Sequence, residues 1–209
     1  MTFKNWYTRK RVIFSNIHLY QIPYYYVKGV NQIDIARKGV LLLDEMWAIC
    51  DSRMSITKRN RFTSNILLRS RKRGLIYLFS AQVMNSLDSR IRRVIDFTCV
   101  PTLNRTETVI KANIFRTGYP KPGSYLNTLY FNTHEIFNMY STNEEVDMED
   151  SVEDDMEIRF QENFNEEHGH FCTCNNCKGQ VFDTWEKADE VAENYWKERF
   201  ERRPDLKVI

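Results

Sequence analysis

Two short runs, residues 39–45 and 75–82, constrain the fold more than any other feature of the sequence. "GVLLLDE" and "LIYLFSAQ" are almost continuously apolar until their last residues. Strands with this pattern typically lie in a parallel sheet that is covered on both faces. The intervening residues 59–74 fit a helix, because their apolar side chains share one helical face and Gly74 follows as a stop signal. Strand, helix and strand in this order predict a βαβ unit and an α/β fold.

Further strand patterns surround this unit and define a first domain over residues 1–140. Residues 11–16 and 94–100 are short apolar runs that also predict strands. Residues 108–118 and 124–132 are more amphipathic, and a "YPKPGS" turn separates them. We expect these two stretches to form an antiparallel extension of the fold.

The chain after this domain differs in composition. Residues 141–167 predict a weakly structured acidic linker, because nine acids and no base occur from Glu144 to Glu157. Residues 168–209 predict a small module that contains a cysteine cluster and a helix from about Thr184 to Arg202. Asp183 is a suitable N-cap for this helix.

The net charge of +2 conceals a strongly basic region. Eleven Lys or Arg residues lie between Arg53 and Arg93, where Asp88 is the single acid. This basic band suits the sequence-independent binding of a DNA backbone, although an acidic protein partner or plain solvent exposure remain alternatives. No run approaches the length of a membrane-spanning helix, and the N-terminus lacks the apolar core of a signal peptide. We therefore expect an intracellular protein.

Carboxylates follow the first apolar run at Asp44 and Glu45, and an amide ends the second at Gln82. Ligands of open α/β sheets bind at the carboxyl ends of the strands. There, Asp44 suits a hydrated Mg²⁺ on nucleotide phosphates, and Glu45 suits the orientation of an attacking water. Gln82, at the tip of the adjacent strand, suits sensing of the terminal phosphate. The alternative is that all three are solvated polar residues at the ends of core strands.

The order of these motifs resembles the ATPase core of the FtsK/HerA superfamily, over about residues 11–140. The nearest resemblance is to genome-packaging ATPases of archaeal viruses, with Zot-type phage assembly ATPases as relatives. Four stretches carry the resemblance: "SNIHL", "LLLDEMWAICDSR", "LLRSRKRGLIYLFSAQ" and "LDSRIRRVIDF".

The resemblance implies a P-loop NTPase-like parallel sheet flanked by helices, with ATP and Mg²⁺ as cofactors. It implies that Asp44 is the Walker B acid that binds Mg²⁺, Glu45 the catalytic glutamate and Gln82 the sensor. It also offers three candidates for an arginine finger that reaches a neighbouring subunit's nucleotide: Arg53, Arg90 and Arg93. The implied assembly is a homo-oligomeric ring that binds DNA and viral packaging or capsid components, in the host cytoplasm or associated with the virion.

The chain departs from this family at the phosphate-binding loop. It has seven glycines, and none forms the G-x-x-x-x-G-K-[ST] pattern that cradles phosphates. Residues 11–16 resemble the family's second strand, so we expect an N-terminally truncated core. The leading interpretation is an ATP-driven DNA translocation and packaging motor that a P-loop completes. The alternative is a non-catalytic adaptor that binds DNA or a partner; a Zot-like membrane assembly protein is a third, less favoured interpretation.

The C-terminal module carries a candidate zinc site. Cys174 and Cys177 have the spacing of a zinc knuckle, and His170 and Cys172 precede them closely. We expect these four residues to bind one Zn²⁺, because the helical histidines of a ββα finger are absent from the sequence. The alternatives are a finger without metal and surface thiols on a tail.

Overall fold

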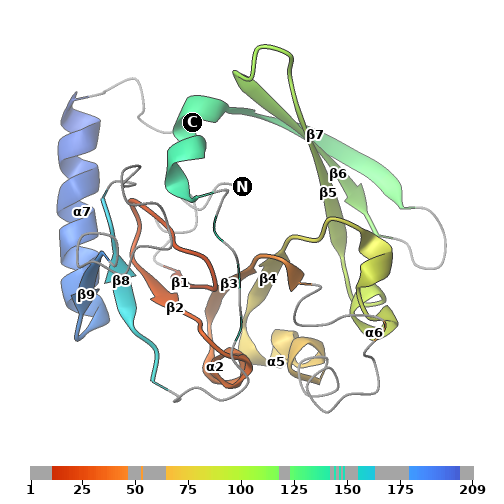
Figure 1. The fold of residues 1–209 in the computed structure, drawn as a ribbon, viewed down its shortest axis with the longest axis horizontal. Helices are drawn as coiled ribbons and strands as arrows, with labels where there is room; N and C mark the ends of the chain where they lie inside the picture. The colour runs from red at the N-terminus through yellow and green to blue at the C-terminus, as the bar shows by residue number, and fades with distance from the viewer. Residues whose placement is uncertain are drawn as a thin grey trace.

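The computed structural model describes residues 11–46, 53, 65–117, 123–141, 144, 146, 148, 155–162 and 179–202. These residues form two sheets that lie side by side (Figure 1). The first sheet has six strands in the order β4-β3-β1-β2-β8-β9, and the second has three in the order β5-β6-β7.

The six-stranded sheet is parallel at one end and antiparallel at the other. β4, β3, β1 and β2 run parallel to one another, whereas β8 and β9 pair antiparallel. The described part of the chain is therefore a mixed α/β fold with a parallel-rich sheet. Its strands are β1 (Val12–Ser15), β2 (Tyr24–Tyr26), β3 (Gly39–Leu43), β4 (Ile76–Phe79), β8 (Ile158–Phe160) and β9 (Gln180–Phe182).

The strands predicted in residues 11–16, 39–45 and 75–82 are confirmed as β1, β3 and β4. Residues 65–68 are helical and α5 (Ser70–Arg73) follows, so the predicted helix between β3 and β4 is confirmed for the described residues. β1 and β3 approach so closely that a Cβ on Gly39 would lie 2.3 Å from the Val12 carbonyl oxygen. Glycine therefore permits this strand pairing.

Each face of the main sheet has its own hydrophobic core, because neighbouring side chains on a strand point to opposite faces. On one face, Phe14 packs in a cluster with Ile33 of α2 (Val30–Ile35) and with Ile66. On the other face, Ile13 packs with Ala192 and Trp196 of α7 (Trp185–Arg202). Helices therefore cover both faces, as the apolar strand patterns predicted.

Two predictions about the C-terminal third need correction. β8 lies inside residues 141–167, which were expected to be a linker, and it pairs with β2. β9 and α7 were expected in a separate module, but β9 pairs with β8 and α7 contributes to the main core. Three-residue strands carry too little pattern to be recognised in sequence, and they are stabilised here by pairing with residues distant along the chain.

The predicted antiparallel extension is confirmed as a separate sheet, joined to the main one through η2 (Met84–Ser86) and α6 (Ser89–Arg92) (Figure 1). It consists of β5 (Phe97–Leu103), β6 (Val109–Arg116) and β7 (Ser124–Asn132). Two short turns of helix, η3 (Thr133–Glu135) and η4 (Phe137–Met139), return the chain to the main sheet. Within the described residues, no helix is long and apolar enough to cross a membrane.

Candidate functional site

The strand order reverses its direction of connection between β1 and β3. The connection after β1 leads to β2 on one side of this pair, whereas the connection after β3 leads to β4 on the other side. Adjacent parallel strands whose connections leave in opposite directions form a topological switch point, where ligands of open α/β sheets bind. Asn16 follows β1 and Asp44 follows β3, so these two residues occupy the switch point.

Asn16 fixes the main chain of Asp44. Its side-chain Nδ2 donates a hydrogen bond to the Asp44 carbonyl oxygen at 3.0 Å. The Asp44 amide donates in return to Asn16 Oδ1 at 2.8 Å. Asn16 is buried, so this two-way bond sets the position at which β3 ends. A buried amide that satisfies both backbone groups contributes order as well as stability.

Ser80, directly after β4, fixes the side chain of Asp44 from the opposite side. Its hydroxyl donates to Asp44 Oδ1 and accepts from the Glu45 amide at 3.1 Å. The Met46 amide also donates to the Ser80 carbonyl, at 3.1 Å. Glu45 has a φ of 49°, in the left-handed region that non-glycine residues rarely adopt. Such backbone geometry costs of order 1 kcal/mol and is stabilised here by the bonds to Ser80.

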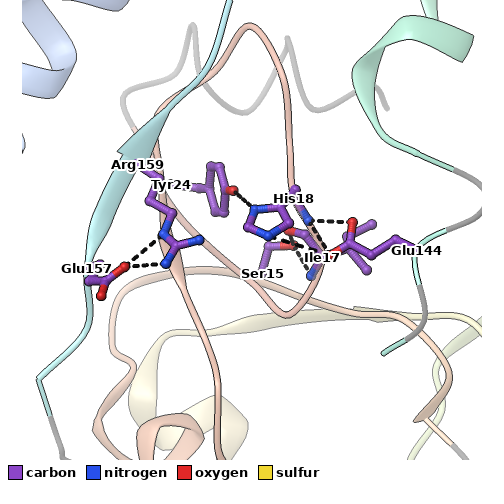
Figure 2. Close-up of polar contacts among 7 residues, drawn as sticks. All are labelled: Ser15, Ile17, His18, Tyr24, Glu144, Glu157 and Arg159. Carbon is purple, nitrogen blue, oxygen red and sulfur yellow. Dashed lines mark hydrogen bonds and ion pairs between the residues drawn. The ribbon is translucent and has the colours of Figure 1, made fainter. Parts of the chain in front are cut away.

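A third carboxylate, Glu144, lies beside this pair. Both of its carboxylate oxygens accept from the His18 amide, at 3.1 and 3.0 Å, and its side chain is 6% exposed (Figure 2). The pKa of Glu144 is raised to about 7, mainly by burial; the bond from His18 opposes the increase, and the nearby charge of Asp44 adds to it. Glu144 was assigned to the acidic linker, where its sequence neighbours gave no sign of a buried carboxylate.

The His18 side chain is held within a buried polar layer next to Glu144. Its Nδ1 lies 3.0 Å from the Tyr24 hydroxyl (Figure 2). Its ring stacks on Tyr26 with centroids 4.6 Å apart. Arg159 of β8 covers the other side of this layer, with its guanidinium carbon 4.4 Å from the Tyr26 centroid. Arg159 Nε also donates to Glu157 at 2.9 Å. These contacts connect the carboxyl edge of the sheet to β8.

The segment around Glu144 packs across the carboxyl edge. Val146 contacts both hydrophobic cores, and Met148 is buried in the core that contains α2. The Met148 sulfur lies 3.9 Å from Asn16 Nδ2, so this segment reaches the side chain that holds Asp44. A ligand at the switch point would therefore meet residues of this segment as well as the strand ends.

The predicted site residues do not all gather at this edge. Asp44 and Glu45 lie together at the end of β3, and Gln82 is exposed two residues beyond Ser80. Ser80 is the polar side chain that contacts Asp44, and sequence reasoning missed it. Its signal was its place as the first polar residue after the strand.

One of the arginine candidates, Arg90, binds a neighbouring aspartate. Its Nε and Nη2 bind Asp88 at 3.0 and 2.7 Å, and Asp88 also caps α6 by accepting from the Arg90 amide. Arg53 and Arg93 are exposed. The guanidinium of Arg90 therefore has a structural role in α6.

The candidate zinc ligands His170, Cys172, Cys174 and Cys177 lie outside the described residues, and this site stays a prediction. Within the described part of the chain, no group of three or more His, Cys, Asp or Glu side chains is arranged to hold a metal ion.

No family model and no curated protein matches the chain. Among solved structures, the N-terminal domain of zonular occludens toxin from Neisseria meningitidis superposes with a TM-score of 0.47 and 14% identity, over 63% of this chain and 80% of that chain. This distant likeness agrees in part with the Zot-type resemblance of the sequence, and it carries no argument about activity. The functional argument rests on the geometry of the switch point.

Proposed function

We propose that this chain is a subunit of an NTP-driven motor that moves DNA, and that Asp44 and Glu45 are its Mg²⁺-nucleotide residues. One observation carries the proposal: the two acids lie at the switch point of a parallel sheet, with their positions fixed by the strand ends on both sides. Solvated acids at the end of a core strand would not require a buried asparagine and a serine to hold them.

The carboxylate half of the site fits the chemistry of a magnesium nucleotide. Mg²⁺ prefers hard oxygen ligands and is commonly held by one or two carboxylates together with phosphates and waters. Ser80 orients the Asp44 carboxylate, and Glu45 is half-buried beside it, where it is suited to orient a water. When bound, the metal would neutralise charge on the phosphates.

The loops that follow β1, β3 and β4 do not provide a binding site for the phosphates of the nucleotide. The described loops 16–23, 44–46 and 80–88 contain no glycine, whereas a phosphate cradle requires close approach of backbone amides. The proposal therefore requires a phosphate-binding loop in addition to these three loops. It also includes a homo-oligomeric ring with viral packaging or capsid components as partners.

Several cations of the basic band bind acceptors within the chain, and several are exposed. Arg73 pairs with Asp34, Arg90 with Asp88, and Arg92 donates to Asn85 at 3.0 Å. The exposed members include Arg69, Lys72 and Arg93. We assign sequence-independent DNA binding to the exposed members, because a DNA backbone is bound by cations at the protein surface.

The central test completes the chain with a phosphate-binding loop and then compares Glu45→Gln with Glu107→Gln in Mg²⁺-ATP binding and hydrolysis. Glu107 is a matched control, because it is exposed, has a φ of 55° and lies in the turn between β5 and β6 of the other sheet. We expect Glu45→Gln to lower turnover at least about 100-fold while nucleotide still binds, since general-base groups contribute roughly that much. Unchanged turnover in Glu45→Gln would contradict the assigned role.

A second candidate function is a non-catalytic adaptor built on this fold. The observation that favours it is the segment containing Glu144, Val146 and Met148, which packs over the edge where a nucleotide would bind. An adaptor would bind DNA with the same affinity in the presence and absence of Mg²⁺-ATP. Measuring DNA affinity with and without the nucleotide separates the two functions.

A further inference from the structure

The small sheet carries a face, here called the tyrosine face, that combines aromatic rings, amides, hydroxyls and a lysine. Residues paired across an antiparallel ladder point to the same side, and alternate residues on a strand share a face. The register therefore places the following pairs on one side: Lys111 with Tyr130, Asn113 with Thr128, and Phe115 with Tyr125. On β5, Val100 pairs with Asn113 and completes this side with Thr98 and Thr102.

The two tyrosines are the most exposed large hydrophobic side chains of this face. Tyr125 is 59% exposed and Tyr130 is 66% exposed. Neither belongs to the two hydrophobic cores of the main sheet. From Lys111 to Phe115 the strand advances four residues, so the main-chain positions of the two tyrosines lie about 14 Å apart along the sheet.

A hydrogen-bonded network fixes the orientation of Tyr125. Its hydroxyl lies 2.8 Å from Thr128 Oγ1, and Thr128 Oγ1 donates to Asn113 Oδ1 at 2.8 Å. The edge of the ring packs against Phe115, with centroids 5.9 Å apart and planes at 70°. Because the hydroxyl reaches a residue three positions along the strand, the ring lies along the sheet. A ring held in this orientation offers its plane to a stacking partner and loses little side-chain entropy on binding.

The charge of the small sheet favours an anionic partner. From Phe97 to Asn132 the sequence contains four bases and one acid, a net charge of +3: Arg105, Lys111, Arg116 and Lys121 against Glu107. Lys111 lies on the tyrosine face itself, directly opposite Tyr130. A cation beside an exposed aromatic ring provides a phosphate contact next to a stacking surface.

The geometry points to the tyrosine face as a binding site for single-stranded nucleic acid, with bases stacked on Tyr125 and Tyr130 and a phosphate bound by Lys111. In a duplex the base planes are stacked on one another, so flat-lying rings have no access to them. The inference rests on the proposed function for the class of partner, nucleic acid. It extends that proposal by specifying that the nucleic acid is single-stranded and that it binds to the tyrosine face.

The test is the affinity of the full chain for a fluorescently labelled oligo-dT, measured by anisotropy at several salt concentrations. We expect Tyr130→Ala and Tyr125→Ala each to weaken binding at least about 5-fold, which matches the lower range for loss of one stacked base. Tyr130→Phe keeps the ring and is expected to keep the affinity. Lys111→Gln is expected to lower the salt dependence of log K by about 0.7, the value for one phosphate contact on a single strand.

The matched control is Phe97→Ala. Phe97 is 62% exposed and lies on the opposite face of the same sheet, because it is one residue out of phase with Thr98 on β5. We expect this variant to bind oligo-dT as the unchanged chain does. Far-UV circular dichroism confirms that each variant keeps the fold.

Three results would overturn the inference: no binding of oligo-dT, equal affinity of the tyrosine variants and the unchanged chain, or an effect of Phe97→Ala as large as theirs. A change in sedimentation caused by Tyr130→Ala without a change in affinity would also overturn it and assign the face to protein contact. Failure of the proposed function is a separate result. If neither the unchanged chain nor any variant hydrolysed ATP, binding of oligo-dT and its dependence on the two tyrosines would remain intact.

Discussion

The two sheets of this protein differ in how deeply their side chains are buried. The buried main sheet stabilises the fold, and the exposed small sheet offers a surface for binding. In β3, Val40, Leu41 and Leu43 are completely buried, because helices cover both faces of the parallel sheet. In the small sheet, Ala112 is the one strand residue in the buried core among those described, and most of β5 is exposed. An antiparallel sheet tolerates such exposure, whereas parallel strands are found almost only under cover on both faces. The main sheet therefore supplies most of the burial, and the small sheet supplies free surface.

The largest expected effect comes from truncating one leucine in each sheet. Leu41→Ala removes a completely buried side chain from β3 and is expected to lower the free energy of unfolding by about 2–5 kcal/mol. Leu103→Ala removes a side chain that is 47% exposed on β5, and we expect a change within about 0.5 kcal/mol. Urea unfolding followed by circular dichroism measures both. Similar losses would show that the small sheet is covered in solution and would break the comparison.

The same difference explains which parts of the fold were predictable. β3 is buried on both faces and β4 is partly buried beside it, and their apolar runs were recognisable without knowledge of their partners. β2 consists of three tyrosines after Pro23, and β8 follows a run of acids, so neither has a strand pattern of its own. Their pairing with each other and with β1 is a tertiary effect that propensity does not encode.

The part of the candidate site that follows an apolar strand was predictable from the sequence, and the part that depends on tertiary contacts was not. Asp44 and Glu45 stand out because charges directly follow an apolar run. Glu144 is distant in sequence and becomes part of the site through the bond from His18 to its carboxylate. Ser80 has no chemical signature until the pairing of β3 with β4 brings it to Asp44.

The second prediction concerns the pH dependence of the main sheet. The pKa of Glu144 rises from 4.5 to about 7 on folding, so the folded state binds more protons than the unfolded state between these values. Glu144 therefore favours folding fully below about pH 4.5, and this contribution is lost as the pH rises towards 7. Glu144→Gln removes the ionisation, and we expect its stability relative to the unchanged chain to increase by roughly 1–3 kcal/mol between pH 5 and pH 8.

Urea unfolding at several pH values tests this prediction, with Glu162→Gln as the control. Glu162 is exposed and follows β8, so its substitution is expected to leave the pH profile unchanged. A parallel pH profile for Glu144→Gln and the unchanged chain would show that Glu144 is hydrated in solution. It would also weaken the case that its segment packs over the switch point.

The smallest expected effect lies at the joint between the two sheets. Asp88 is buried in the connection from β4 to β5, where it caps α6 and binds the guanidinium of Arg90. The bond from Arg90 holds the pKa of Asp88 below its ordinary value, and burial partly opposes this effect. Its stabilising contribution is therefore present above the pKa of the unfolded carboxyl and is lost as the pH falls through the lower pKa of the folded state.

At neutral pH we expect Asp88→Ala to lower the free energy of unfolding by about 1 kcal/mol, the usual value of a helix cap. Asp88→Asn keeps an oxygen that accepts from the Arg90 amide, so its loss is expected to be smaller. Urea unfolding at neutral and strongly acidic pH compares the two variants. The difference between Asp88→Asn and the unchanged chain is expected to vanish in acid, whereas part of the loss in Asp88→Ala is expected to remain, because a protonated Asp88 still accepts from the Arg90 amide. A loss in Asp88→Ala as large as that in Leu41→Ala would show that the joint belongs to the main core. The small sheet would then be an extension of that core and not a surface attached to it.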